Sequence, residues 1–296
     1  NGKVTGLATW SANGTRTKAR MLLALKAILI FAVLAYMTVV AVMYFAQRRF
    51  MYFPETVRAS PAAAGLSRVS EIVIPTPDGE KLIAWYGKAR PGKPTLLYLH
   101  GNGGSLAFRS GTMRKYLDDG LGMLMLAYRG YSGSTGSPSE AANIADAKLA
   151  YDTLIKDGVR PEDIILYGES LGSGVAVRVA AEKKVEGVIL DAPYTSIVEL
   201  AVAQFPWLPV NLLLQDRYET IKHIRDVHVP IFILHGDADE VVPVEMGRRL
   251  YAAANEPKEI KIIPGGGHVI HDGPSFAFID HWIDRLRAGK LKGPPH

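Results

Sequence analysis

The 296-residue sequence contains no cysteine. Disulfide bonds, thiolate nucleophiles and cysteine-ligated metal sites are therefore excluded. The chain also lacks any stripe of basic residues interleaved with aromatic ones, although its formal net charge is +5. Its lysines and arginines are scattered among acidic residues, so the charge does not predict binding to nucleic acid. The length and the 48% hydrophobic content suit one large domain with a substantial core, or two small ones.

Residues 27–46 lack charge altogether and read AILIFAVLAYMTVVAVMYFA. A stretch of this length, at about 1.5 Å per residue, forms a helix about 30 Å long, which is the thickness of a bilayer core. Lys26 stands before it and Arg48 and Arg49 follow it, as expected for a membrane anchor. The sequence therefore predicts one transmembrane helix at residues 27–46, preceded by a tail at residues 1–26.

Two other interpretations of this apolar segment are open. It could be a core helix, although core helices rarely run so far without a charge. It could also be a cleaved signal peptide, whose apolar part usually spans about 7 to 15 residues and ends in small residues at −1 and −3 of the cut. Ala46 suits −1, but Tyr44 is too large for −3. Positive charge before the segment slightly exceeds that after it, which favours an N-terminus in the cytoplasm.

Beyond a connector at residues 47–70, short apolar runs alternate with longer amphipathic stretches. The runs at 71–76 and 81–86 flank the turn sequence PDGE and predict a hairpin. The later apolar runs are almost continuous, which is typical of parallel strands covered on both faces; they are residues 95–100, 122–128, 163–168, 187–192, 230–236 and 259–265. Helices are predicted between them, at 106–119, 139–157, 171–184, 243–254 and 274–288. Residues 71–290 are thus expected to form an α/β domain, a mostly parallel sheet with helices on both faces.

One serine, Ser170, stands between Gly168 and Gly172 in the stretch YGESLGSG. It lies where a predicted strand gives way to a predicted helix. A sharp turn at that junction strains the serine backbone and crowds its neighbours, and glycine tolerates such crowding. The turn also exposes the hydroxyl in front of free N–H groups at the helix start. The pattern predicts a nucleophile elbow of the form G-x-S-x-G.

A serine nucleophile needs a base, and the base needs an acid to orient it. In this kind of fold the expected chain order is serine, then acid, then histidine. Asp237 and Asp239 follow an apolar run in LHGDADEVVP, and His268 follows three glycines in PGGGHVIHD. Either aspartate could instead cap a turn. The order Ser170, Asp239, His268 fits the expected triad.

Other histidines are alternatives for the base. His271 and His281 could take that role or lie on the surface. A metal site at His268, His271 and Asp272 is not predicted, because a clear further ligand is missing. We expect no cofactor.

The loop at residues 97–105, LYLHGNGGS, is rich in glycine and follows a predicted strand. Such a loop can bring a backbone N–H to the carbonyl oxygen of a substrate. The N–H groups of Asn102 and Leu171 are the predicted oxyanion donors, although a plain glycine turn is the alternative. His100 and His235 each precede a glycine at a strand end and are interpreted as structural residues, hydrogen-bonded within their loops.

The motifs HGNGGS, AYRGYSGSTGSPSE, GESLGSGVAV and HGDADEVVP together resemble the α/β-hydrolase superfamily over residues 70–290. They are similar in particular to the membrane-anchored abhydrolase-domain serine hydrolases, which carry one N-terminal span. The resemblance implies Ser170 as nucleophile, His268 as base and Asp239 as acid, because the acid in that branch directly precedes the xVVP segment. Two departures, Ser173 in place of a frequent glycine and Ala127 in place of a frequent acid, lie outside the triad.

The expected function is a membrane-tethered serine hydrolase that cleaves carboxylic ester or thioester bonds of small-molecule or lipid-like acyl substrates. A serine peptidase or acyltransferase on the same fold is an alternative, as is a catalytically silent binding module. Residues 205–214, FPWLPVNLLL, could form a wall of an acyl pocket or pack onto the sheet.

Overall fold

The computed structural model describes residues 7–291, with side chains from residue 16 onward. The chain divides between Gln47 and Arg48 into two compact units. Helix α1 (Leu7–Met51) runs through the first unit, and its last turn belongs to the second. Its stretch Arg16–Met51 is the one helix in the described part of the chain that is long and apolar enough to cross a membrane. The apolar run at residues 27–46 lies inside it, with large exposed side chains such as Phe31 and Leu34.

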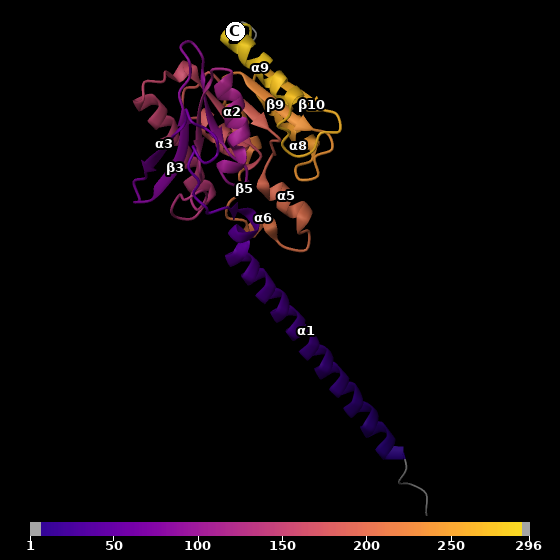
Figure 1. The fold of residues 1–296 in the computed structure, drawn as a ribbon. Coiled ribbons are helices and arrows are strands. Elements are labelled where there is room, and N and C mark those ends of the chain that lie inside the picture. Colours follow the sequence, from indigo (N-terminus) through magenta and orange to yellow (C-terminus); the bar gives the residue numbers. More distant parts are fainter. Residues whose placement is uncertain (1–6, 292–296) are drawn as a thin grey trace, which may run out of the picture. The chain divides into compact units, whose positions relative to one another are not determined.

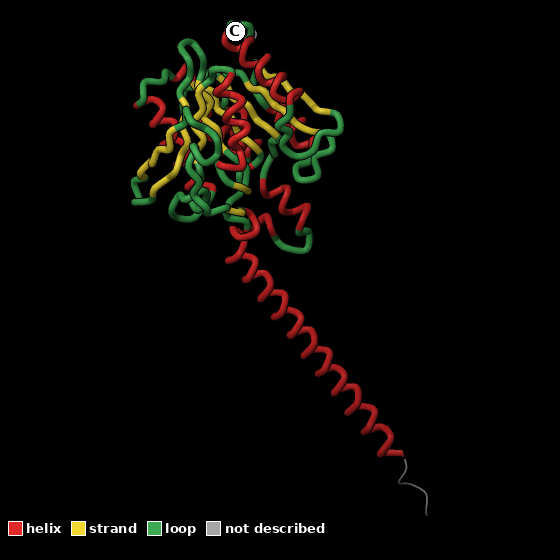
Figure 2. Tube along the Cα trace, in the orientation of Figure 1, coloured by secondary structure: helices red, strands yellow, loops and turns green. Residues whose placement is uncertain are grey.

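The second unit is built on an eight-stranded sheet with the strand order β10-β9-β8-β7-β4-β6-β3-β2 (Figures 1 and 2). The strands are β2 (Ser70–Pro75), β3 (Lys81–Gly87), β4 (Thr95–Leu99), β6 (Gly122–Leu126), β7 (Ile164–Glu169), β8 (Gly187–Asp191), β9 (Ile231–Gly236) and β10 (Lys258–Ile263). Strand β3 pairs antiparallel with both β2 and β6, and the other neighbours are parallel. The predicted hairpin and the predicted mostly parallel α/β sheet are both confirmed.

The burial of the strands explains their composition. Every residue of β4, β6, β7, β8 and β9 is buried. A strand covered on both faces has no solvent side on which to alternate polar residues, so its sequence is a continuous apolar run. Strand β10 lies at the sheet edge and is only half-buried, which fits the lysines and the glutamate in its sequence KEIKII.

Helices cover both faces of this sheet. The main ones are α2 (Ser110–Asp118), α3 (Glu140–Lys156), α4 (Leu171–Ala180), α8 (Val244–Ala253) and α9 (Gly273–Arg287). The chain reverses its direction across the sheet after β6, so right-handed crossovers place α3, α4 and α8 on the face opposite α2. Helix α9 lies beside α2, where the rings of Tyr116 and Phe276 meet edge to face. All the βα loops therefore open at one edge of the sheet, the carboxyl ends of the parallel strands.

The stretch from Arg48 to β2 is packed within the second unit. Tyr52 and Leu66 are buried in its core. Strand β1 (Phe53–Pro54) pairs in parallel with β5 (Gly103–Gly104), which lies in the glycine-rich loop after β4. A segment that the sequence indicates only as a connector thus contributes to the core and to a loop at the carboxyl edge of the sheet.

The segment between β8 and β9 forms three short helices, α5 (Ile197–Gln204), α6 (Val210–Leu213) and α7 (Thr220–His223), joined by loops. Within residues 205–214, Val210 is buried, whereas Trp207 and Leu212 are exposed. The stretch is therefore only partly packed, and two of its large apolar side chains face solvent.

Candidate active site

Ser170 sits in a strained turn between β7 and α4. Its backbone angles are φ 48° and ψ −114°, in a region that residues other than glycine rarely adopt. The flanking glycines are required by close approach. A Cβ on Gly168 would lie 2.6 Å from Gly172 O, and a Cβ on Gly172 would lie 1.9 Å from Leu99 O. The turn therefore has the strand–turn–helix geometry expected of an elbow that projects a serine from the sheet.

Two residues distant in the sequence meet this serine. The Oγ atom of Ser170 lies 2.9 Å from Nε2 of His268. On the other side of the imidazole, Nδ1 of His268 lies 2.8 Å from Oδ2 of Asp239. A carboxylate can only accept, so Nδ1 carries the proton and Nε2 is free to accept from the serine hydroxyl. The three side chains come from the loops that follow β7, β9 and β10, all at the carboxyl edge of the sheet.

The Asp239 carboxylate is buried, and hydrogen-bond donors of the protein surround it. Its Oδ1 accepts from the N–H groups of Val241 and Val242, both at 2.8 Å. Nε2 of His235 lies 3.3 Å from its Oδ2. Burial raises the pKa of Asp239, but hydrogen bonds from His235, His268 and Val242 lower it more, so the pKa lies well below its ordinary value. This carboxylate is therefore ionised at neutral pH and can balance a positive charge on His268.

The alternative acid and bases have other partners. Asp237 accepts a hydrogen bond from Gly265 N at 2.6 Å and so holds a turn. Nε2 of His271 lies 3.3 Å from Asp191 Oδ2, and its Nδ1 lies 3.2 Å from Thr112 Oγ1. His281 is exposed on α9. The structure thus places His268 beside Ser170 and Asp239 beside His268. None of the alternative residues, Asp237, His271 and His281, takes these places.

The loop of residues 100–105, called the oxyanion loop below, passes directly beside Ser170. A Cβ on Gly101 would lie 3.5 Å from the Cβ of Ser170 and 2.7 Å from Glu169 Oε1. Asn102 follows Gly101 in this loop. Leu171 is the first residue of α4, where N–H groups have no acceptor within the helix. The two predicted oxyanion donors thus belong to the two main-chain segments that adjoin Ser170.

The histidine at the start of this loop is structural, as predicted. Nδ1 of His100 donates to Gly101 O at 2.6 Å, and its Nε2 accepts from Tyr128 N at 3.2 Å. Burial lowers the pKa of His100 to about 3, so the ring is neutral. His235 is likewise bonded within its own loop, with Nε2 2.9 Å from Val242 O. Its second contact, to Asp239, was not expected from the sequence.

A buried ion pair lies next to the elbow and was not predicted from the sequence. Nε and Nη2 of Arg109 donate to the two carboxylate oxygens of Glu169, the residue before Ser170, at 2.8 and 2.5 Å. Nη2 also donates to Gly103 O at 3.0 Å. Burial raises the pKa of Glu169, but the hydrogen bonds and charge of Arg109 and the hydrogen bond from Tyr98 lower it by more, so that it lies at about 2. The guanidinium therefore ties the oxyanion loop to the residue beside Ser170. Glu169 lies inside the G-x-S-x-G motif, but no sequence motif around Arg109 indicates that it pairs with Glu169.

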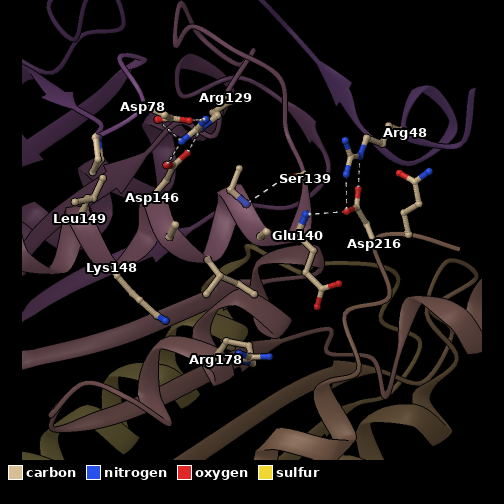
Figure 3. Close-up of a pocket in the computed structure, with 16 residues that line it drawn as sticks. Arg48, Asp78, Arg129, Ser139, Glu140, Asp146, Lys148, Leu149, Arg178 and Asp216 are labelled. Carbon is tan, nitrogen blue, oxygen red and sulfur yellow. Dashed lines mark hydrogen bonds and ion pairs between the residues drawn. The ribbon is translucent and has the colours of Figure 1, made fainter. Parts of the chain in front are cut away.

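A separate open cavity of about 1030 Å³ lies along the start of α3 (Figure 3). Ser170, Asp239 and His268 do not line it. Among its lining residues, Arg129 lies between Asp78 and Asp146, and Arg48 binds Asp216. The cavity and the Ser170 site are therefore separate features of this unit.

Comparisons with known proteins identify the family of the chain. The sequence profile of the α/β-hydrolase fold matches residues 94–216, and that of the S33 serine aminopeptidases matches residues 211–274. An uncharacterized protein of Mycobacterium tuberculosis is 38% identical over 225 residues, which are 75% of this chain and 80% of that protein.

A lipase and an esterase are also similar. The lysophosphatidylserine lipase ABHD12 of Danio rerio is 32% identical over 200 residues, 60% of this chain and 51% of that protein. The chain thus spans about half the length of this lipase. A crystallised esterase of Pyrococcus furiosus shares the fold with a TM-score of 0.61 at 22% identity, covering 82% of this chain and 98% of the esterase. The chain is a hydrolase of the α/β-hydrolase family and belongs to its abhydrolase-domain branch.

Proposed function

We propose that this protein is a membrane-anchored serine hydrolase that cleaves carboxylic ester or thioester bonds through an acyl-enzyme. The observation that carries the proposal is the hydrogen-bonded chain from Ser170 through His268 to Asp239. Nucleophile, base and acid in this order are sufficient to activate a serine hydroxyl at neutral pH.

The reaction follows from the positions of these groups. Oγ of Ser170 attacks the carbonyl carbon while Nε2 of His268 takes the hydroxyl proton. The N–H groups of Asn102 and Leu171 stabilise the negative charge on the tetrahedral oxygen. His268 then gives the proton to the leaving alcohol or thiol as its bond to carbon breaks. Water attacks the acyl-enzyme by the same route in reverse, and Ser170 regains its proton. Every step uses side chains and backbone of this chain, without a cofactor.

Lipid-like acyl esters are the substrates we favour. Trp207 and Leu212 present large apolar surfaces on the segment between β8 and β9. Such side chains suit contact with an acyl chain. The similarity to a lysophosphatidylserine lipase supports the same substrate class. The S33 profile match over residues 211–274 favours peptide bonds as the second candidate.

A panel of substrates separates the two candidates. The purified full chain, in detergent, is offered p-nitrophenyl esters of graded acyl length, matching thioesters, and aminoacyl and dipeptidyl anilides. We expect turnover of esters and thioesters, because nothing described in the site is aimed at a free amino terminus. Rates on the anilides should stay at background. Anilide turnover that exceeds ester turnover would make the protein a peptidase and defeat this part of the proposal.

Membrane anchoring is supported by the composition of α1. Its run at residues 27–46 is uncharged, and most of its side chains are exposed. We expect the full chain to remain in the membrane pellet on alkaline carbonate extraction. A matched control, Val33→Arg with Met37→Arg, places two charges near the middle of the run. Each should cost about 2.5–3.5 kcal/mol of insertion, so this variant should be released.

Release of the unaltered chain by carbonate would contradict the anchor. The mass of the membrane-associated protein distinguishes the remaining alternative, since a cleaved signal peptide would leave a protein that lacks residues 27–46.

A further inference from the structure

We infer that the segment Arg48–Pro54, which directly follows the apolar part of α1, positions the oxyanion loop for catalysis. This inference rests on the proposed function. It assigns a role in the reaction to main-chain groups that precede the sequence motifs described above and that would otherwise serve only to join an anchor to an enzyme.

The contacts converge on Asn102. Its main-chain carbonyl accepts a hydrogen bond from Phe53 N at 2.9 Å. Its side-chain Nδ2 donates to Met51 O at 3.1 Å. The next two residues of the loop, Gly103 and Gly104, pair in parallel with Phe53 and Pro54. The segment therefore forms hydrogen bonds with both the main chain and the side chain of Asn102, whose N–H is the predicted oxyanion donor.

The side chains of Tyr131 and His100 also fix the main chain around Asn102. Together with Met51 and Phe53 they are called the clamp below. The hydroxyl of Tyr131 donates to the same Asn102 carbonyl at 2.7 Å. The preceding carbonyl, Gly101 O, is held by Nδ1 of His100 at 2.6 Å. Both peptide groups that flank the Asn102 Cα are thus fixed, so the direction of the Asn102 N–H depends on these bonds. Arg48–Pro54 supplies the part of the clamp that comes from outside the sheet and its loops.

The segment is itself fastened to the hydrolase unit. Arg48 donates to both oxygens of Asp216, at 2.8 and 3.2 Å (Figure 3). The hydroxyl of buried Tyr52 lies 3.2 Å from Asp216 Oδ2 and 2.9 Å from the hydroxyl of Tyr218. Asp216 also accepts from Glu140 N at 3.2 Å, at the start of α3. A segment held at both ends in this way can transmit a fixed position to the loop.

The chemistry of an oxyanion hole makes this position matter. Loss of one donor from such a hole typically lowers kcat by about 10²–10³. A displacement of about 1 Å in a catalytic group can cost on the order of 10². The side chain of Phe53 is 55% exposed, so its packing contributes little and its N–H is the feature that matters. The last residue of the uncharged run, Ala46, lies only a few residues before Phe53 in the sequence.

A pair of variants at one position isolates the hydrogen bond. In the full chain in detergent, Phe53→Pro removes the N–H donor, whereas Phe53→Ala keeps it. We expect Phe53→Pro to lower kcat on a soluble short-chain p-nitrophenyl ester about 10- to 100-fold, with little change in KM, because the donor acts mainly in the transition state. Fluorophosphonate labelling should slow in parallel. Phe53→Ala should stay within about twofold of the unaltered protein on both measures.

A second variant tests the same clamp from the loop side. Asn102→Ala keeps the backbone N–H and loses the bond to Met51 O, and we expect about a tenfold loss of kcat at unchanged KM. It decides the matter if Phe53→Pro fails to fold, as judged by its melting temperature. Unchanged kcat and labelling in the folded variants would overturn the inference, as would a rise in KM alone. If the unaltered protein hydrolyses no ester and is not labelled by the probe, the proposed function is wrong. If the unaltered protein is active and the folded variants behave as it does, only the inference is wrong.

Discussion

Replacing Ser170 by alanine should abolish covalent labelling by a fluorophosphonate probe and lower kcat on a short-chain ester by on the order of 10⁴ or more. The reason is geometric. Its Oγ is the atom that Nε2 of His268 approaches, at 2.9 Å. Without this oxygen no acyl-enzyme can form, and only the oxyanion donors and substrate binding are left to accelerate attack by water. Labelling is measured by in-gel fluorescence and turnover by release of p-nitrophenol.

Ser173→Ala is the matched control for this variant. Ser173 lies on α4, close to Ser170 in the sequence, and is fully buried. Its hydroxyl has no hydrogen-bond partner in the described part of the chain. Removal of an unpaired buried hydroxyl should leave labelling and turnover near the unaltered level. Persistent labelling of Ser170→Ala would show that another residue is the nucleophile. An unaltered protein that is folded but takes no label would favour the silent binding module.

Replacing Asp239 by asparagine should lower kcat by on the order of 10⁴, because the amide favours the wrong tautomer of the imidazole. The carboxylate accepts from Nδ1 of His268 and from the N–H groups of Val241 and Val242. An asparagine at this position can still accept through its oxygen, but its amide nitrogen can only donate. If that nitrogen faces His268, Nδ1 must accept and the proton moves to Nε2, where it blocks the serine.

The neighbouring Asp237→Asn variant is the control for this effect. Asp237 is exposed and accepts from Gly265 N, a bond that an asparagine oxygen can also accept. We expect its kcat to fall no more than a few-fold, within the usual range of surface substitutions. Steady-state rates of both variants over a range of pH measure the difference. A larger loss at Asp237 than at Asp239 would reverse the assignment of the acid.

The fold of the hydrolase unit could be predicted from sequence because its signals are local. The run DIILYG predicts a strand at residues 163–168, and β7 occupies Ile164–Glu169. Such runs stand out because a parallel strand buried on both faces tolerates few polar residues. The elbow was predictable for a similar reason. Gly168 and Gly172 are demanded by backbone contacts of 2.6 and 1.9 Å that a Cβ would make.

The site could be predicted only in part. Chain order and the resemblance pointed to Asp239, but the choice against Asp237 depends on which aspartate faces the imidazole after a tight turn. The spacing of residues along the chain does not predict in which direction each aspartate side chain points. In the structure Asp239 meets His268 and Asp237 meets Gly265. The catalytic roles stay predictions until the variants are measured.

The sequence by itself determined the α/β fold, the position of the elbow and the presence of a separate apolar helix, because each depends on residues adjacent or periodic along the chain. Tertiary structure alone decided what holds the site together. The Arg109–Glu169 pair joins residues on different elements, and the clamp on Asn102 includes main-chain groups of Met51 and Phe53. Backbone N–H and C=O groups are the same in nearly every residue, so a contact between them leaves no mark in the sequence.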